Sequence, residues 1–470
     1  MVGNKERQQA SHAEKYAWTV PFVLFLGMIS ALILHESIDI GILLGYGGAV
    51  LYARSVGCSI HQVLRATWSG VVNMWRVSVV LLLIGVVIAL WMAGGTIPTL
   101  TEFGAVFIHN SNVIWIAFLL ASGLSMVIGS SLATWGILGP PILALTPPQL
   151  YPVVAGALVS GGMVGDRSSP MSTSVLVMSQ AVGLSPTTTL TQLLRTVVVP
   201  IIFTFFALLI LSKGVTLRGH VVVVHDVAFT PKSLLYVMPA ILVIGLALWR
   251  VSLLYNLLVA VFIGGIFAHF ATHESIDHLL HQIWNGYPLA LNGKNFAIGG
   301  VRPMLQASLL IFTAGAFQGV TSLGGAMEAI TERLFARITT RTGFVAVSYG
   351  LSIAYTTLLG SQSLSLLMSG NTLLPQFTQR KLRREVVLRI ISDSAELVSA
   401  IVPWNLLGFQ AAVILKVSTL HLIPYAWFIY SALTFSAIST WRYLAQQLKT
   451  PFLGDQQKFT ELGSEDGKVQ

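Results

Sequence analysis

Apolar runs of about 20 residues, the length that an α-helix needs to cross the hydrocarbon core of a membrane, recur along the whole chain and alternate with short polar or glycine-rich stretches. They predict spanning helices over 16–34, 38–52, 77–93, 113–128, 193–211, 233–248, 253–270, 304–319, 344–359, 386–402 and 424–445. This pattern predicts an all-α polytopic membrane protein.

Polar segments divide the chain. In order, we expect a polar tail over 1–15, a first transmembrane half over 16–211, a linker over 212–232, a second transmembrane half over 233–446 and a disordered polar tail over 447–470. The first run is expected to be a retained helix rather than a signal peptide, because no small-residue cleavage site follows it. Within the halves, residues 54–76 are expected to form a basic connection and residues 271–300 a hydrophilic loop.

Composition agrees with a membrane protein. The 470 residues are 54% hydrophobic and only 10% charged, whereas soluble domains average about 25% charged residues. The single cysteine, Cys58, excludes an intramolecular disulfide and any cysteine-based metal site. The net charge of +9 is expected in cytoplasmic loops, most strongly in the basic run 380–384, because such loops orient membrane proteins. No module for nucleic-acid binding accompanies it.

Two charges, Asp166 and Arg167, stand in the stretch 161–170 between two apolar runs. Glycines, a proline and small hydroxyl residues surround them, so we expect an irregular backbone here. An ionisable residue at membrane depth is costly and by default marks an ion path or a proton relay. Arg167 is expected to act on its neighbour Asp166, or to bind a substrate carboxylate. The alternative is an ordinary loop with both charges in water.

A second charged stretch interrupts the apolar run 386–402. Asp393 and Glu396 are three residues apart, so they share roughly one face of a helix. Two acids on one face of a membrane helix point to function. The alternative is a structural group that Arg389, four residues before Asp393, neutralises.

Glycine-rich breaks precede both acidic stretches, at Gly129-Ser130-Ser131 and at Gly360-Ser361-Gln362. Unwound carbonyls and hydroxyls would be oxygen ligands for a small hard cation, although close helix packing through small residues is an equal alternative. These breaks, the pairs Gly94-Gly95 and Gly324-Gly325, and the two acidic stretches recur at an offset of about 230 residues, the arrangement of a transporter with paired broken helices. We expect two inverted repeats whose broken or re-entrant helices meet at the bilayer midplane.

Two other groups are expected to be solvated rather than functional. Glu102 is a lone acid in a short segment after the glycines 94 and 95. The histidines at 269, 273, 278 and 281 are irregularly spaced and have no cysteine partner, so a metal site is the weaker interpretation.

Four elements between residues 85 and 411 resemble the NhaC-type sodium/proton antiporters, within the wider ion-transporter superfamily. Trp91-Met-Ala-Gly-Gly-Thr-Ile-Pro98-Thr is similar to that family's W-x-x-S-G-T-I-P-T, Gly129-Ser-Ser-Leu-Ala-Thr-Trp-Gly136 to its G-T-S-W-G-T-x-G, Gly165-Asp166-Arg167-Ser-Ser169-Pro170-Met-Ser172 to its G-D-K-x-S-P-L-S, and Ser392-Asp393-Ser394 with Pro403-Trp404-Asn405 to its E-D-S and P-W-N. The resemblance implies a multi-pass transporter of a bacterial inner membrane that exchanges sodium or another cation for protons by alternating access.

The departures from that pattern bear on the substrate. Thr173 and Ser361 stand where the family has acids, Ser392 replaces a glutamate, and Arg167 replaces a lysine. Glu396 appears where the family has a small residue. Fewer carboxylates leave open a transporter of the same fold that moves an organic anion or amino acid with proton or sodium coupling. An intramembrane hydrolase is a third alternative, but no nucleophile or metal motif supports it.

For transport at these stretches, we expect Asp166 and Asp393 to carry the exchangeable proton or the cation. Oxygen ligands are expected from Ser130, Ser131, Thr134, Ser169, Ser172 and Asn405. Substrate contact or charge pairing is expected from Arg167, Glu396, Ser361, Gln362 and Trp404. We expect no catalytic residue, metal or cofactor, only coupling to H⁺ with or without Na⁺. The expected partners are membrane lipid and a small cation or small organic substrate, with no nucleic acid, and a homodimer stays open.

Overall fold

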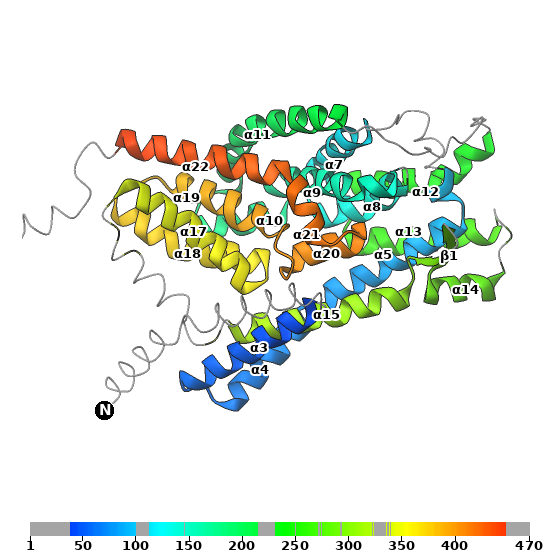
Figure 1. Cartoon of the computed structure of the whole chain (residues 1–470), viewed down its shortest axis with the longest axis horizontal. Helices are drawn as coiled ribbons and strands as arrows, with labels where there is room; N and C mark the ends of the chain where they lie inside the picture. Colours follow the sequence, from blue (N-terminus) through cyan, green and yellow to red (C-terminus); the bar gives the residue numbers. More distant parts are fainter. Residues whose placement is uncertain are drawn as a thin grey trace, which may run out of the picture.

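A computed structural model describes residues 38–99, 112–144, 146–214, 231–249, 251–270, 275–291, 294–321 and 340–447, with four single residues between these ranges. The described part is almost entirely helical, which confirms the expected all-α fold, and most of its long helices lie roughly along the long axis of the molecule (Figure 1). Both polar tails, the predicted first span, most of the linker, Glu102 and the pair Gly324-Gly325 lie outside the described residues.

The first half contains α3 (Ile38–Ser55), α4 (Ile60–Asn73), α5 (Trp75–Ala93), α7 (Val113–Ile128), α8 (Ser131–Ala144), the short turn η2 (Pro148–Leu150), α9 (Tyr151–Ser168), α10 (Thr173–Val182) and α11 (Pro186–Gly214). The second half contains α12 (Pro231–Leu248), α13 (Leu253–Phe270), α14 (Ile276–Asn285), β1 (Tyr287–Leu291), β2 (Lys294–Ile298), α15 (Val301–Thr321), α17 (Arg341–Leu359), α18 (Gln362–Gln379), α19 (Arg384–Ile391), a π-helical turn (Ser392–Glu396), α20 (Leu406–Leu415), α21 (Thr419–Leu422), η4 (Ile423–Tyr425) and α22 (Trp427–Gln447). Helices α7 and α13 have the predicted bounds, and most other predicted spans differ from their helices by a few residues at the ends.

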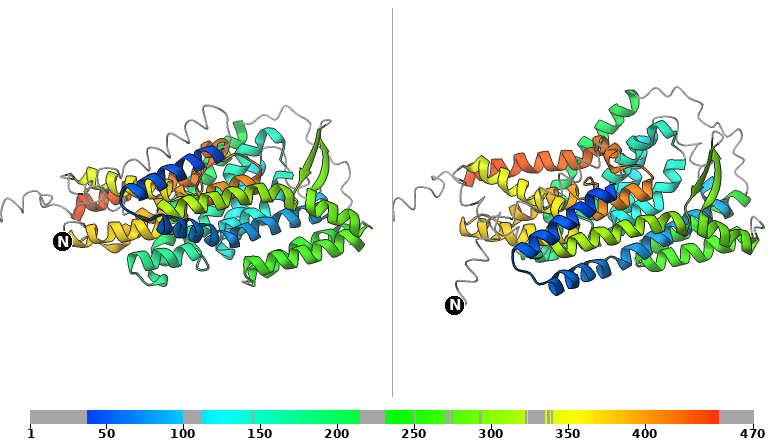
Figure 2. Two further views of the ribbon diagram at one scale, coloured as in Figure 1. Left: turned by 90° about the horizontal axis from the view of Figure 1, so that it is seen from below. Right: turned by 60° about the horizontal axis from the view of Figure 1, so that its bottom comes forward.

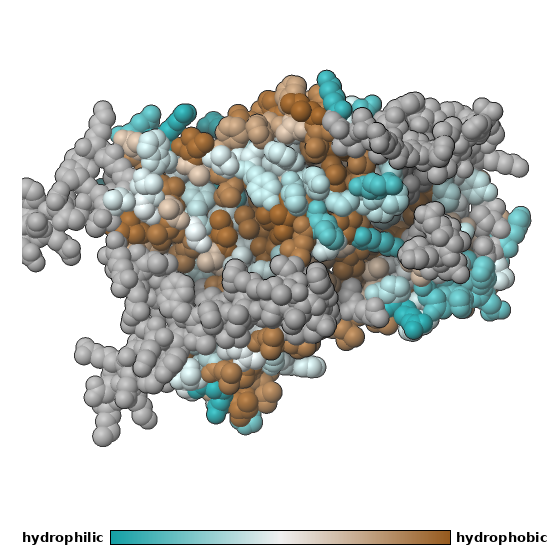
Figure 3. All heavy atoms as spheres, in the orientation of Figure 1, coloured by the Kyte–Doolittle hydropathy of each residue, from teal (hydrophilic) through white to brown (hydrophobic). Residues whose placement is uncertain are grey.

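Within the described residues, three helical stretches are long and apolar enough to span a membrane: Ile60–Ala93, Pro186–Lys213 and Thr342–Leu359. Residues 406–415 and 419–425 bend by 87° at their break and would together form a fourth span. Large apolar side chains are exposed along α11, among them Val198, Ile202 and Phe206. Hydrophobic residues also cover much of the middle of the face in Figure 3, while hydrophilic residues gather at its right-hand end. Such a surface is typical of contact with lipid.

Two predicted connections contain regular structure, which corrects the sequence interpretation. In 54–76, Ser59 and Gln62 form a reciprocal capping box that starts α4. Helix α4 then packs closely on α15, where a Cβ on Gly70 would lie 2.0 Å from the Gly315 carbonyl oxygen. In 271–300, α14 is followed by an antiparallel hairpin in which Tyr287 pairs with Ile298. Figure 2 shows this hairpin at one end and α15 beside α3 and α4.

The predicted span 386–402 is not one continuous helix. Helix α19 passes into the π-helical turn, and the chain then unwinds before α20 begins at Leu406. The side chain of Asn405 caps α20 by accepting a hydrogen bond from the Leu407 N–H. This interruption places Asp393 and Glu396 in the widened turn rather than on a regular helix.

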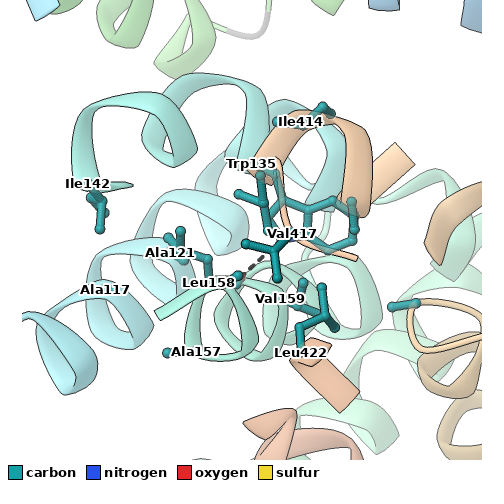
Figure 4. Packing of buried hydrophobic residues seen from close by; sticks show 14 of the residues in the cluster. Ala117, Ala121, Trp135, Ile142, Ala157, Leu158, Val159, Ile414, Val417 and Leu422 are labelled. Atoms are coloured by element: carbon teal, nitrogen blue, oxygen red, sulfur yellow. Dashed lines mark hydrogen bonds between the residues drawn. The ribbon is translucent and has the colours of Figure 1, made fainter. Parts of the chain in front are cut away.

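Two large hydrophobic clusters and a small third one hold the described helices together. One lies mainly among α5, α7, α8, α9 and α20, and the other mainly among α10, α17, α18 and α19. Figure 4 shows part of the first core, where Trp135 of α8 lies over α9 and donates from its ring nitrogen to the Leu158 carbonyl at 3.0 Å. Ile414 of α20 packs against the same tryptophan region.

Glycines on α9 let its neighbours approach the backbone directly. A Cβ on Gly165 would lie 2.0 Å from the Ser125 carbonyl carbon of α7, and one on Gly162 would lie 2.2 Å from the ring nitrogen of Trp135. Only glycine fits at such distances, and small residues are what close helix contacts in membranes use. The last turn of α9, which carries Asp166, is thereby fixed between α7 and α8.

Candidate functional site

Asp166 lies in the last turn of α9 and is only 5% exposed. The expectation of an irregular backbone is wrong for residues 161–168, because they continue the helix. The glycines that suggested unwinding serve close packing instead. The alternative of a solvated loop is also wrong, since Arg167 is fully buried. The chain leaves the helix only at Ser169, and α10 begins directly after Ser172.

Four neutral side chains donate hydrogen bonds to the Asp166 carboxylate. Ser131 Oγ lies 2.8 Å and Gln362 Nε2 lies 3.4 Å from Oδ2. Ser174 Oγ lies 3.3 Å and Ser172 Oγ 3.4 Å from Oδ1, and Ser172 also donates to the Asp166 main-chain carbonyl. Within the described part of the chain, no cationic side chain forms an ion pair with this carboxylate. The charge of Asp166 is therefore solvated by dipoles but not neutralised.

Three helices begin beside Asp166. Ser131 is the first residue of α8, Ser174 the second of α10, and Gln362 the first of α18. A helix N-terminus carries partial positive charge and free N–H groups, so it attracts a carboxylate. The glycines before α8 and α18 both adopt the left-handed conformation, with φ of 75° and 62°, which glycine accepts without steric cost. The predicted glycine breaks are thus confirmed in both halves, and each directs a helix start to Asp166.

Arg167 points away from Asp166 and joins the two halves. Its Nε lies 2.6 Å from Asp393 Oδ1, and both side chains are 1% exposed. Its Nη1 donates to the Leu193 carbonyl at 3.1 Å and its Nη2 to Thr196 Oγ1 at 2.9 Å. The expectation that Arg167 acts on the neighbouring carboxylate is wrong, because successive residues of an α-helix point about 100° apart. Each of its three guanidinium nitrogens thus donates to a protein group.

Asp393 is likewise held in place by protein groups. Arg389, which the sequence offered as its neutralising partner, donates to Ser439 of α22 instead. The partner of Asp393 is Arg167 of the first half. A buried ion pair is held when geometry and additional hydrogen bonds are good, and the bonds from Arg167 to α11 supply them.

Glu396 differs from both aspartates. It is fully buried at the end of the π-helical turn, a distortion that often occurs at functional sites. Neither of its carboxylate oxygens has a hydrogen-bond partner among the described residues. It lies within electrostatic range of Asp166, Arg167 and Asp393. A carboxylate without partners is the costliest polar group to bury in charged form.

Several predicted ligands make structural hydrogen bonds rather than contacts to the acids. Ser130 Oγ accepts from the Ala133 N–H at 3.2 Å and so caps α8. Thr134 Oγ1 donates to the Ser130 carbonyl at 2.8 Å. Ser169 Oγ donates to the Met126 carbonyl at 2.7 Å, which ties the end of α9 to α7.

The remaining predicted residues hold the second-half break together. Asn405 caps α20 and donates from Nδ2 to the Thr356 carbonyl at 3.0 Å. The ring nitrogen of Trp404 donates to the Thr357 carbonyl. Ser361 precedes α18, and its carbonyl accepts from Ser365 Oγ at 2.6 Å. None of these groups reaches the Asp166 carboxylate.

Sequence reasoning missed Ser174 as a partner of Asp166 and Thr196 as a partner of Arg167. The signal for Ser174 was local: Ser172 and Ser174 open the helix that follows the acid, and hydroxyls in a first helical turn lie close to a group before the break. Thr196 lies on α11, and no local pattern connects it to α9.

The Asp166 site combines one carboxylate, three hydroxyls and one side-chain amide, all of which carry oxygen atoms. Oxygen ligands suit a small hard cation. A hydroxyl that donates to the carboxylate can rotate and offer a lone pair to an ion instead. The same carboxylate can take a proton, so this arrangement can hold a cation or a proton in turn.

Comparison with known proteins gives one family. The chain matches the model of the Na⁺/H⁺ antiporter family over residues 9–213 and 186–441. It is 28% identical to the Na⁺/H⁺ antiporter NhaC of Bacillus subtilis over 381 residues, which cover 77% of this chain and 83% of that protein. It is 26% identical to NhaC of Alkalihalophilus pseudofirmus over 363 residues, 75% of this chain and 78% of that protein. It is also 26% identical to a malate-2H⁺/Na⁺-lactate antiporter of Bacillus subtilis over 439 residues, 88% of this chain and 93% of that protein.

Proposed function

The chain belongs to the Na⁺/H⁺ antiporter family, and we propose that it exchanges sodium for protons at Asp166. The observation that carries this assignment is the carboxylate itself, which is buried, hydrogen-bonded to neutral donors alone among the described residues, and approached by helix starts from both halves. A buried carboxylate without a counter-charge costs several kcal/mol. It therefore takes up either a cation or a proton, and the two compete for one place.

The oxygen atoms around Asp166 complete the ion site. When sodium enters, the hydroxyls of Ser131, Ser172 and Ser174 turn their lone pairs toward it and the amide oxygen of Gln362 closes the shell. When sodium leaves, a proton replaces it on the carboxylate. Gln362 reaches Asp166 from the second half, so a movement of α18 relative to α9 opens the site and gives alternating access.

Glu396 carries a proton beside this site. It has no hydrogen-bond partner for its charged form in the described structure and lies within electrostatic range of Asp166. A neutral carboxylic acid is far cheaper to bury than its anion. Glu396 thus passes its proton to Asp166 as the cation departs and takes up another proton from water, so that neither acid stays charged. Asp393, neutralised by Arg167, joins the two halves instead of carrying the exchanged proton.

Exchange of an organic acid is the second candidate, and the similarity to a malate-2H⁺/Na⁺-lactate antiporter favours it. Arg167 is the residue expected to bind a substrate carboxylate. Its guanidinium is occupied by Asp393, Leu193 and Thr196, so the geometry favours the cation at Asp166.

Everted membrane vesicles test the proposal. After a pH gradient has formed, sodium should dissipate it in vesicles with the wild-type protein and leave it intact in vesicles with Asp166→Asn at equal protein level. Asp277→Asn is the matched control, because Asp277 is an exposed acid on α14. A normal sodium response in Asp166→Asn would remove that residue from the site. A response to malate or lactate without one to sodium would favour the second candidate.

A further inference from the structure

A second polar feature lies outside the Asp166 site. An open cavity of about 270 Å³ is lined by α11, α19, the π-helical turn and α22. Its wall includes one arginine from each of the three helices: Arg195, Arg389 and Arg442. Asp393 also forms part of the wall, but Arg167 already neutralises it.

These three arginines have no acidic partner in the described part of the chain. Arg389 donates through Nη1 to Ser439, and its Nε is buried and finds no hydrogen-bond partner among the residues that the structure describes. Arg195 and Arg442 are exposed. Like charges gathered around one cavity repel each other, and an anion in the cavity would relieve that repulsion. The same charge makes the cavity a poor entry path for sodium.

The cavity lies toward the strongly basic end of the helix bundle. Arg389 stands about 8 Å along the axis from the start of α19, and Arg442 about 8 Å from the end of α22, at 1.5 Å per helical residue. Arg384, in the basic run 380–384, donates to the Gly183 carbonyl at 3.2 Å, so the starts of α19 and α11 lie together. Basic loops of this kind mark the cytoplasmic side, and the arginines lie one to three turns inside it.

The rim of the cavity is apolar and exposed. Val199 of α11 and Phe435 and Ile438 of α22 line it with 53%, 38% and 45% of their surfaces exposed. They continue the apolar face of α11, where Phe203 also contacts Phe435 with a ring-centroid distance of 5.9 Å. Arginines inside an apolar rim provide charge for a headgroup and surface for acyl chains, as basic pockets between membrane helices do.

We propose that this cavity binds the phosphate group of an anionic membrane phospholipid. Guanidinium groups bind phosphate oxygens in bidentate fashion. Hydroxyls of Thr196, Ser436 and Ser439 in the wall supply further hydrogen-bonding groups. The acyl chains lie along Val199, Phe435 and Ile438. This assignment concerns lipid binding alone and does not depend on which cargo the protein moves.

Thermal unfolding of the purified full-length protein in a neutral detergent tests the assignment. The probes are short-chain phosphatidylglycerol, phosphatidylcholine of the same chain length, and inorganic phosphate. The variant is Arg195→Gln/Arg442→Gln. Both arginines are exposed, so their replacement should leave the core packing unchanged. Arg383→Gln is the matched control, because it removes an exposed charge at the same end of the bundle but outside the cavity.

Phosphatidylglycerol should raise the unfolding temperature of the wild type and of Arg383→Gln, and phosphatidylcholine should do so much less because its choline cation meets the arginines. The double variant should need at least about tenfold more lipid for the same shift, since charge-assisted hydrogen bonds are lost. An unchanged lipid requirement in the double variant would overturn the proposal, as would an equal loss in Arg383→Gln. A shift by inorganic phosphate alone, lost in the double variant, would assign the cavity to a free anion and overturn the lipid.

Discussion

Asp166 and Asp393 are both buried acids, one in each half of the chain, but their partners differ. Asp166 is held by three hydroxyls and an amide, all neutral. Asp393 is held by the guanidinium of Arg167. Neutral donors position a carboxylate and leave its charge available, whereas a cationic partner uses that charge. Under the proposed function, the charge of the partner, more than residue type or burial, is what separates the exchange site at Asp166 from the structural link at Asp393.

The largest effect is expected when the positive charge of Arg167 is removed. Arg167→Gln leaves Asp393 buried without a counter-charge, which should destabilise the folded protein by about 3–5 kcal/mol. The Arg167→Gln/Asp393→Asn variant removes both charges and should regain most of that stability. Tryptophan-fluorescence melting curves of the purified proteins measure the effect. A single variant that melts with the wild type would show that the pair does not hold the halves together.

Neutralising Glu396 separates proton delivery from ion binding. Glu396→Gln keeps the size of the side chain but cannot release a proton. Sodium-driven exchange should slow by about 100-fold, the lower range for loss of a proton-transfer group, while the sodium concentration for half-maximal rate stays the same. Initial rates in proteoliposomes across a sodium series give both quantities. A weaker sodium affinity at an unchanged maximal rate would instead make Glu396 an ion ligand.

Removing one proposed oxygen ligand tests whether sodium binds at Asp166. Ser131 makes the shortest side-chain contact to that carboxylate, at 2.8 Å. Ser131→Ala should raise the sodium concentration for half-maximal rate about tenfold, as loss of a supporting group at a metal site does. The maximal rate should change little. An unaltered sodium dependence in the same assay would place the ion elsewhere.

The smallest effect on exchange is expected from removal of the neighbouring Thr134 hydroxyl. Thr134 is buried on the same helix, but its Oγ1 donates to the Ser130 carbonyl. Thr134→Val keeps the shape of the side chain, and the sodium dependence of its exchange should match the wild type to within about twofold, as expected away from the site. A tenfold change, equal to that of Ser131→Ala, would mean that the hydroxyls of α8 act through the helix start rather than as individual ligands.

Much of the fold was accessible from the sequence because apolar run length and glycine position are local signals. The runs 113–128 and 253–270 became α7 and α13, and Gly129 and Gly360 became left-handed residues between paired helices. The acids were also identifiable, since charges are rare in such runs. Helix α4 was missed because its basic residues suggested a loop, although its capping box was present in the sequence.

The partners of the site residues were harder to predict, for a geometric reason. Ser130, Ser131 and Thr134 all carry hydroxyl groups, and the sequence does not distinguish them as ligands. Their positions around the helix start direct only Ser131 to Asp166. The same phase separates Arg167 from its neighbour and brings it to Asp393, more than two hundred positions away. Long-range pairing and side-chain direction depend on how helices pack, and a single sequence does not state either.

Calorimetric titration of sodium into purified protein, in two buffers of different ionisation enthalpy, tests the central claim most directly because it reports sodium binding and proton release together. The account predicts that wild-type protein releases protons as sodium binds, and that Arg167→Gln/Asp393→Asn still does so. Asp166→Asn should neither bind sodium nor release protons. Sodium binding with undiminished proton release in Asp166→Asn would contradict the account.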